Sequence, residues 1–307
     1  MPKMTRGQQQ QLAQLAAANN IEALRAACIE HMHRIAPTTN LNSNRYDASW
    51  HNNLRLMADW LGSDSALPFQ VFNLRGNSKL PFAAFSALPG VTCPGAGDCL
   101  SWCYSFKAWR FARAFCRQVQ NTILLTTHAG RLAISGAWQQ LPANADIRLY
   151  VDGDFPDVET LRYWMELCLT RSALNVYSYS KSWAEFLALS RDGYEFPRNY
   201  TLNLSSGSKH DSAMAAQLRA IPSSPVRGEF LAVKVGHHHI HSGAYRDKTH
   251  PGSKAYRAEI LSQLREAFGP GKYFACPGNC GNCMPRGEHA CGSPKMQDVT
   301  IAIGLHV

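Results

Sequence analysis

The sequence predicts an α/β protein in which strands and helices alternate as in a (β/α) barrel, preceded by a helical N-terminal extension. Short apolar segments alternate with amphipathic helical segments from about residue 69 onward. The connections between them are short, which favours parallel strands with the helices as crossovers. The first 66 residues lack this alternation and instead repeat apolar residues at helical spacing. We therefore expect an extension over residues 1–66 and a barrel-like domain over residues 67–307.

The extension is predicted to contain two helices over residues 1–36 and a helical segment near residues 54–61. Asn20 is a suitable N-cap for the second helix. The apolar residues that follow it at helical spacing are Leu24, Cys28, Met32 and Ile35.

In the second part, the predicted strands are 69–74, 82–88, 147–151, 175–180, 200–204, 230–235 and 299–305. The predicted helices are 106–140 with a break near Gly130 or Gly136, 158–171, 183–193, 210–221 and 254–268. Ser182 and Glu185 fit a capping box for the third of these helices. About six such units are typical of a partial or complete barrel, either TIM-like or radical-SAM-like. In such barrels the chemistry takes place at the C-terminal ends of the strands.

The composition excludes several classes of protein. Of 307 residues, 45% are hydrophobic and only 17% are charged, which excludes a largely disordered chain. No apolar run is long enough to span a membrane, and the N-terminus has no apolar signal region. We therefore expect a cytoplasmic protein without a membrane partner.

The net charge of +9 is concentrated in one stretch of the chain, because no acidic residue occurs between Asp98 and Asp146. The basic residues proposed here for nucleic-acid binding are Lys107, Arg110, Arg113 and Arg117. The three arginines share one face if the segment is helical. The aromatic residues Trp102, Tyr104, Phe106 and Trp109 interleave with the basic residues and suit base stacking, with a place in the core as the alternative. The segment is expected to bind an anionic partner such as DNA or RNA, with a solvated helix face as the alternative.

Seven of the ten cysteines form two groups in Gly/Pro-rich loops. The first group is a C-x5-C-x3-C run of Cys93, Cys99 and Cys103. The second is a C-x3-C-x2-C run of Cys276, Cys280 and Cys283, followed by Cys291. Convergent thiolates are typical of zinc or iron–sulfur sites, so we expect these seven residues to be metal ligands. One shared site and two separate sites both remain open, and Cys116 and His128 are candidate extra ligands for the first group.

The C-x3-C-x2-C spacing resembles the run of radical S-adenosylmethionine enzymes, which makes S-adenosylmethionine a candidate cofactor. In those enzymes the run usually follows the first barrel strand. Here it lies near the C-terminus, and the group in the expected position has a different spacing.

Two further clusters are candidate sites. Asp152 and Asp154 follow a predicted strand and project to the same side, where they can bind Mg²⁺ or act as acid and base, with Lys181 as a partner. Helix capping and a plain salt bridge are the alternatives. His237, His239 and His241 can hold a divalent metal, and His239-Ile240-His241 resembles the motif of HUH endonucleases, for which Tyr245 and Tyr256 supply candidate nucleophiles. A polar His-rich loop is the alternative.

The stretches CPGAGDCLSWCY, IRLYVDGDFPDVETLRYW, NVYSYSKSW and CPGNCGNC occur in this order over roughly residues 80–290. In this pattern the chain resembles the gene product 88 family, which phages and mobile elements carry. The resemblance implies a metal-binding α/β architecture. Our leading hypothesis is a metal-dependent, iron–sulfur enzyme acting on an anionic substrate such as nucleic acid. A zinc-stabilised nucleic-acid-binding protein without catalysis and a DNA-nicking endonuclease are the alternatives.

Overall fold

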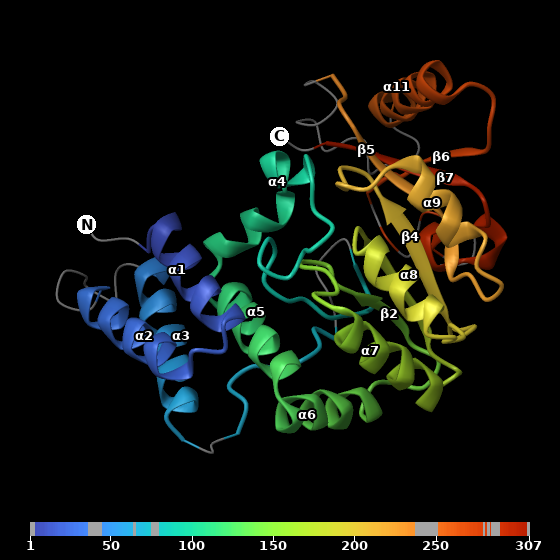
Figure 1. Cartoon of the computed structure of the whole chain (residues 1–307). Helices are drawn as coiled ribbons and strands as arrows, with labels where there is room; N and C mark the ends of the chain where they lie inside the picture. The colour runs from blue at the N-terminus through green and yellow to red at the C-terminus, as the bar shows by residue number, and fades with distance from the viewer. Residues whose placement is uncertain are drawn as a thin grey trace.

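A seven-stranded sheet forms the centre of the protein, and every strand pair in it is parallel (Figure 1). The computed structural model describes residues 4–35, 45–63, 66–74, 80–236, 251–278, 280, 283 and 289–305. The strand order is β1-β2-β3-β4-β5-β7-β6. The strands are β1 (Ala83–Ala84), β2 (Asp146–Leu149), β3 (Asn175–Ser180), β4 (Tyr200–Ser205), β5 (Val226–Val233), β6 (Tyr273–Ala275) and β7 (Thr300–Gly304).

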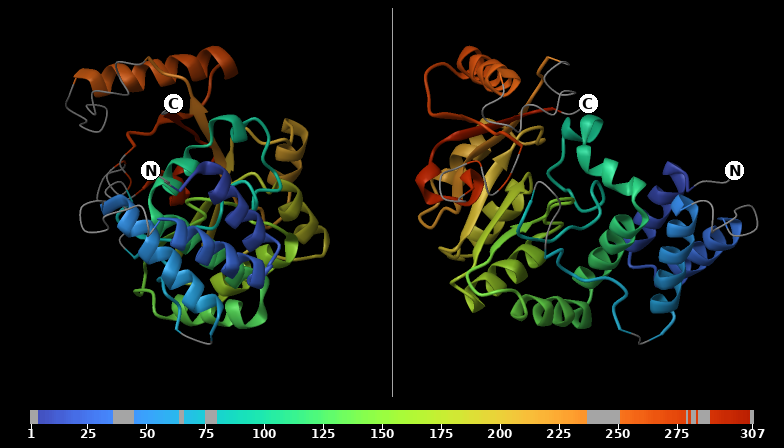
Figure 2. Two further views of the ribbon diagram at one scale, coloured as in Figure 1. Left: turned by 90° about the vertical axis from the view of Figure 1, so that its left-hand side faces the viewer. Right: turned by 180° about the vertical axis from the view of Figure 1, so that it is seen from behind.

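One face of the sheet is covered by α7 (Val158–Thr170), α8 (Trp183–Arg191) and α9 (Ser212–Arg219), which lie side by side (Figures 1 and 2). Apolar side chains that alternate along the strands, such as Ile147, Val176 and Leu202, pack in one core with residues of these helices. Farther along the sheet, α11 (Pro251–Phe268) packs with β6 and β7 through a smaller core around Tyr256. This is the arrangement expected when each helix returns the chain to the next parallel strand.

The opposite face, called here the inner face, carries aromatic and polar residues. The strand residues on it include Arg148, Tyr177, Tyr179, Asn203 and Ile301. The C-terminal segment with Cys276, Ala290 and Cys291 packs against this face. It includes the short helices η5 (Ala290–Gly292) and η6 (Pro294–Met296).

Three helices precede the sheet: α1 (Arg6–Ala17), α2 (Ile21–Ile35) and α3 (Arg45–Leu61). The two helices predicted over residues 1–36 are thereby confirmed. The three lie together at one end of the molecule, against α5 (Ala112–Thr126) (Figures 1 and 2). Trp50 of α3 packs on Phe115 of α5 with ring centroids 5.6 Å apart. The helical extension is therefore joined to the rest of the fold by a buried apolar core.

The α/β prediction is confirmed, and the topology adds detail. Strands β1 to β5 are consecutive neighbours, whereas β7 lies between β5 and β6. Within the described residues β1 does not pair with β6, so the sheet is open as described. No described helix is long and apolar enough to cross a membrane.

The predicted strand 69–74 is wrong, because side chains of α5 occupy its backbone groups. Gln120 accepts a hydrogen bond from the Phe69 N–H (3.0 Å) and donates to the Phe69 carbonyl (2.9 Å). Asn121 donates to the carbonyl of Val71 (3.0 Å). Only one isolated bridge, between Asn73 and Ala84, remains from the expected pairing in this segment.

The predicted helix 106–140 consists of three pieces: the 3₁₀ helix η2 (Tyr104–Arg110), α5 and α6 (His128–Gln139). Thr127 is extended and accepts a hydrogen bond from the Gly130 N–H, so the break near Gly130 is confirmed. Phe111 is also extended, which places Arg110 before the helix that carries Arg113 and Arg117. The expectation that the three arginines share one helix face is therefore wrong.

The predicted capping box at the start of α8 is also wrong. Ser182 makes no side-chain capping bond, because its hydroxyl donates instead to the carbonyl of Phe155 (2.8 Å).

Candidate functional site

The loop of the first cysteine group lies across the C-terminal ends of β3 and β4. The Cys99 N–H donates to the Gly207 carbonyl (3.2 Å), and the Lys209 N–H donates to the Gly95 carbonyl (3.0 Å). A Cβ on Gly95 would collide with the Lys181 carbonyl. Glycine is therefore required for this close approach, which brings Cys93 and Cys99 to the edge where parallel sheets place their chemistry.

Asp154 joins the ends of β2 and β3. Its Oδ1 accepts from the Ser180 hydroxyl (2.6 Å) and the Phe155 N–H (2.9 Å), and its Oδ2 accepts from the Lys181 N–H (2.7 Å). Its own N–H donates to Thr92 in the cysteine loop (3.3 Å). Asp154 is thus an anchor for the edge of the sheet, at 3% exposure.

Asp152 has different partners from Asp154. Its Oδ2 accepts from Gln118 (2.9 Å), and Arg148 and Arg117 stabilise its charge. Because β2 ends at Leu149 and Tyr150 has a φ of 54°, the alternation that would place both carboxylates on one side does not continue. The structure therefore does not form the predicted carboxylate pair, although burial raises the pKa of both groups.

Lys181 lies between the first cysteine group and β4. Its Nζ donates to the Ser205 hydroxyl (2.9 Å), so it contacts Asp154 through its backbone N–H rather than through an ion pair. Burial, reinforced by Asp154, raises the pKa of Cys93 to about 12, while the charge of Lys181 acts in the opposite direction. Burial likewise raises the pKa of Cys99 against the effect of Lys181. A catalytic role for Asp152, Asp154 and Lys181 stays a prediction.

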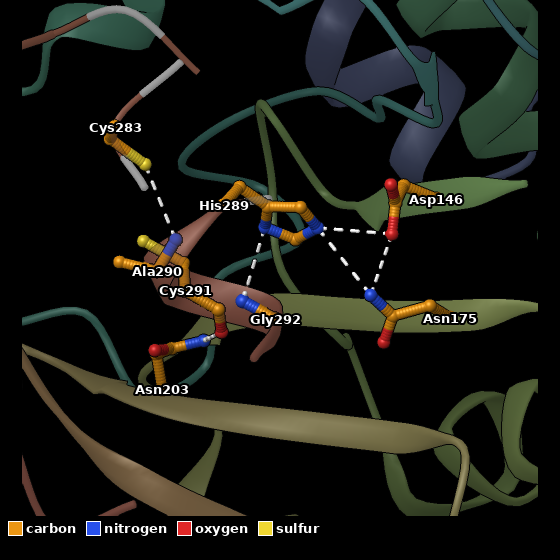
Figure 3. Close-up of polar contacts among 8 residues, drawn as sticks. All are labelled: Asp146, Asn175, Asn203, Cys283, His289, Ala290, Cys291 and Gly292. Carbon is orange, nitrogen blue, oxygen red and sulfur yellow. Dashed lines mark hydrogen bonds and ion pairs between the residues drawn. The ribbon is translucent and has the colours of Figure 1, made fainter. Parts of the chain in front are cut away.

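The second cysteine group lies on the inner face. Cys276 follows β6, and its N–H donates to the Ala302 carbonyl of β7 (2.7 Å). Backbone N–H groups donate to two of the sulfurs, from Gly278 to Cys276 Sγ (3.4 Å) and from Ala290 to Cys283 Sγ (3.2 Å; Figure 3). A hydrogen bond with Tyr179 lowers the pKa of Cys291 against the larger effect of burial. Such contacts stabilise sulfur in its negatively charged form.

The donor set of the second group fits a metal with four thiolate ligands. Cys276, Cys280, Cys283 and Cys291 lie within electrostatic range of one another. Burial raises the pKa of Cys276 well above its ordinary value and that of Cys291 to about 12. In the described part of the chain, no three His, Cys, Asp or Glu side chains are close enough to hold a metal as they stand. The four sulfurs are therefore neighbours that a metal would have to draw together.

The two groups have different surroundings. Burial has the largest effect on the pKa of Cys93 and of Cys99, and the charged groups that act on both are Asp154, Lys181 and Cys103. Burial also has the largest effect on the pKa of Cys276 and of Cys291, but there the neighbouring groups are the other cysteines of the second group and, for Cys291, Tyr179 and Arg227. Cys116, the candidate extra ligand, is buried beside Cys28 in the core of the N-terminal helices.

His289 fastens the second group to the start of β2 and β3 (Figure 3). Its Nδ1 accepts from the Gly292 N–H (3.2 Å), so its Nε2 carries the proton and faces Asp146 Oδ1 at 3.1 Å. The ring packs against both Phe82 and Tyr177, with centroids 4.9 and 4.6 Å away. Both nitrogens are engaged, which makes His289 an anchor of the Cys291 segment rather than a metal ligand.

A buried arginine lies behind the same segment. Arg227 is 1% exposed, and its Nε donates to Asn203 Oδ1 (2.6 Å). Asn203 in turn donates to the carbonyls of Cys291 (2.9 Å; Figure 3) and Ser178 (3.0 Å). No described carboxylate forms a salt bridge with Arg227, and Cys291 is the largest influence that favours its charge. The sequence did not indicate a role for Arg227, Asn203 or His289. For Arg227 alone a signal was available, because a charged residue at the start of an apolar strand is unusual.

The basic segment is exposed near the first cysteine group. Lys107, Arg110 and Arg113 are exposed, whereas Arg117 is half-buried and lies near Asp152. Phe111 and Tyr104 are 57% and 48% exposed. The Arg110 guanidinium lies over the ring of Phe111, 4.8 Å from its centroid. This mixed basic and aromatic surface suits an anionic polymer with flat bases.

The histidines of the proposed nicking motif, His237, His239 and His241, lie outside the described residues, as does Tyr245. Tyr256 is fully buried, and its hydroxyl accepts from the Gly304 N–H (2.7 Å). It is therefore not placed as an accessible nucleophile.

A family model described as gene product 88 matches residues 60–291, well over half of the chain. The chain belongs to the gene product 88 family. The match begins near the end of α3 and ends at Cys291, so it includes both cysteine groups, Asp152, Asp154 and Lys181. No curated protein and no solved structure matches the chain.

Proposed function

We propose that this gene product 88 protein is a thiolate metalloprotein, with an iron–sulfur cluster held by Cys276, Cys280, Cys283 and Cys291. The observation that carries the proposal is the gathering of these four cysteines on the inner face. Cys276 and Cys291 are buried and Cys280 and Cys283 are half-buried. Burial opposes deprotonation of the first two thiols, and metal binding would displace their protons. The N–H groups that face Cys276 and Cys283 support a thiolate there.

The charge of Arg227 also supports a metal centre. A metal site with four thiolates carries net negative charge, and a buried guanidinium without a carboxylate partner is costly. Arg227 lies near Cys291 and is fixed by hydrogen bonds to Asn203 and the carbonyls of Met296 and Val299. It is thereby suited to offset the charge of the centre.

We further propose that the protein is an enzyme acting on an anionic substrate such as nucleic acid, at the edge formed by the first cysteine group. Cys93, Cys99 and Cys103 supply three thiol ligands there and leave room for a substrate or cofactor as a further ligand, S-adenosylmethionine among the candidates. Lys107, Arg110 and Arg113 provide positive charge beside this edge.

The consecutive order of β1 to β5, with α7, α8 and α9 on one face, supports a partial barrel. A reducing, cytoplasmic location accords with the proposed metal sites, because clustered cysteines in such a compartment are typical of metal binding rather than of a disulfide framework.

Metal analysis with an absorption spectrum of anaerobically purified protein tests the metal proposal. We expect iron and sulfide, with absorption at about 400 nm. C283A and C291A should lose the colour, whereas C168A, which removes a buried thiol from α7, should keep it. Stoichiometric zinc without colour would replace the iron–sulfur assignment by a zinc site. A protein that binds neither metal would overturn the thiolate centre itself.

A further inference from the structure

Arg148 is a half-buried cation on the inner face, in a cluster with the phenols of Tyr104, Tyr177 and Tyr179. It stands in β2 at the same register as Tyr177 of β3. Its guanidinium carbon lies 4.3 Å from the ring centroid of Tyr179, and its Nη2 donates to the Tyr104 hydroxyl (3.1 Å). The guanidinium stays charged at any physiological pH.

Two buried polar atoms in this cluster have no hydrogen-bond partner among the described residues: Arg148 Nε and the Tyr177 hydroxyl. Tyr177 is 0% exposed, so water does not reach it from the surface. An unsatisfied buried donor is destabilising, and native proteins rarely leave two of them together. Because the two residues are register partners on one face, a single acceptor group can serve both.

The charges around Arg148 are also unbalanced. Asp152 is the carboxylate whose charge Arg148 stabilises, but Arg117 stabilises the same carboxylate. In the described part of the chain, no salt bridge joins Arg148 to an acidic side chain. Among the described residues, Arg148 and Arg117 therefore share the carboxylate of Asp152, which leaves the pair with an excess of positive charge.

We propose that Arg148 and Tyr177 form a binding site for an oxyanion, the carboxylate or phosphate group of a small ligand. Arg148 offers Nε–H for a charge-assisted hydrogen bond, and the Tyr177 hydroxyl donates a second. Tyr104, half-exposed and bound to both Arg148 and the Val151 carbonyl (3.0 Å), covers the guanidinium on its solvent side. Rotation of Tyr104 opens the way to the site.

The site lies between the two cysteine groups. Cys280 is within electrostatic range of Arg148, and Tyr104 directly follows Cys103 in the chain. The assignment of this oxyanion to the substrate rests on the proposed function. The binding of the anion itself is independent of the proposed function, because it needs neither metal nor catalysis.

Calorimetric titration of the purified full chain with inorganic phosphate, and separately with acetate, tests the site. We expect saturable binding of one of the two anions, and the tighter one identifies the ligand group. R148Q should weaken that binding at least tenfold, as for a lost charge-assisted hydrogen bond. R162Q is the control, since Arg162 pairs with Asp192 on the outer surface and its loss should leave binding unchanged.

Y177F keeps the test decisive if R148Q fails to fold. It removes only a buried hydroxyl that has no described partner, so the unfolding midpoint should not fall, while anion affinity should drop severalfold. The proposal is overturned if neither anion binds to the wild-type protein or if Y177F binds as tightly as the wild type.

The metal content of R148Q separates this site from the metal proposal. We expect it to equal that of the wild-type protein. Loss of the metal in a folded R148Q would show that Arg148 serves the thiolate centre instead, and would overturn the oxyanion site alone.

Discussion

Replacing Asp154 by asparagine should destabilise the protein far more than the same change at Asp157, three residues along the chain. Asp154 uses both oxygens as acceptors, for Ser180 and Phe155 on one and for Lys181 on the other. Asparagine keeps one acceptor and turns an NH₂ group toward a donor. At Asp157 a single oxygen accepts from the Thr160 N–H (2.7 Å), and asparagine caps a helix as well as aspartate.

The magnitude follows from the bonds that are lost. The charge-assisted bond at Lys181 or Ser180 contributes about 1.5–3 kcal/mol, and the donor left unsatisfied costs about 1–3 kcal/mol more. D154N should therefore lose roughly 3–5 kcal/mol, which lowers the midpoint of thermal unfolding by about 6–15 °C in a domain of this size. D157N should lose less than about 1 kcal/mol.

Thermal unfolding followed by circular dichroism, with urea unfolding as a second measure, compares the two variants with the wild-type protein. If D154N unfolds within about 2 °C of D157N, Asp154 does not anchor the edge of the sheet. Its burial would then be better explained by a role in catalysis.

Three further predictions concern the loop, the pH dependence and the basic surface. G95A should prevent the first cysteine loop from crossing Lys181 and should strongly lower the unfolding midpoint. The control is G136A, where a Cβ meets nothing within 4 Å, and it should raise stability by about 0.5–1 kcal/mol. A stable G95A protein would contradict the loop geometry. Burial raises the pKa of Asp146, but the hydrogen bonds from His289 and Asn175 outweigh it, so the net pKa is lowered. The contribution of Asp146 to stability is therefore present above the unfolded pKa of about 3.9 and is lost as pH falls below it. Unfolding midpoints measured from pH 6 to pH 3 should fall less steeply in D146N than in the wild-type protein. Parallel curves for the two proteins would refute this. If the exposed basic segment contacts phosphates, the triple variant K107Q/R110Q/R113Q should reduce the slope of log affinity against log salt for duplex DNA by up to about 2.7. R117Q should leave this slope nearly unchanged. Equal slopes for the wild type and the triple variant would exclude this surface as the DNA-binding site.

The sequence predicted β3 at its observed bounds and α7 to within a residue, because both have strong periodicity and clear ends. It also located both cysteine groups. It did not predict the inner face, because Asn203 and the Cys291 carbonyl are 88 positions apart in the chain, and periodicity assigns a residue to a face without naming its partner. The carboxylate pair was mispredicted for a local reason, since the left-handed conformation of Tyr150 ends the strand before Asp152.

The position of β7 between β5 and β6 predicts an order of assembly. β6 joins the sheet only through β7, although it precedes β7 in the chain. Strands β1 to β5, paired in sequence order, can form while the later segments are still unplaced. Cys276 and Cys291 both lie between β6 and β7 in the chain, so we expect them to reach their places only once β7 has paired with β5. Thiolate ligands in this segment would thus reach their final positions at the end of folding, after the aromatic surface that receives them is complete.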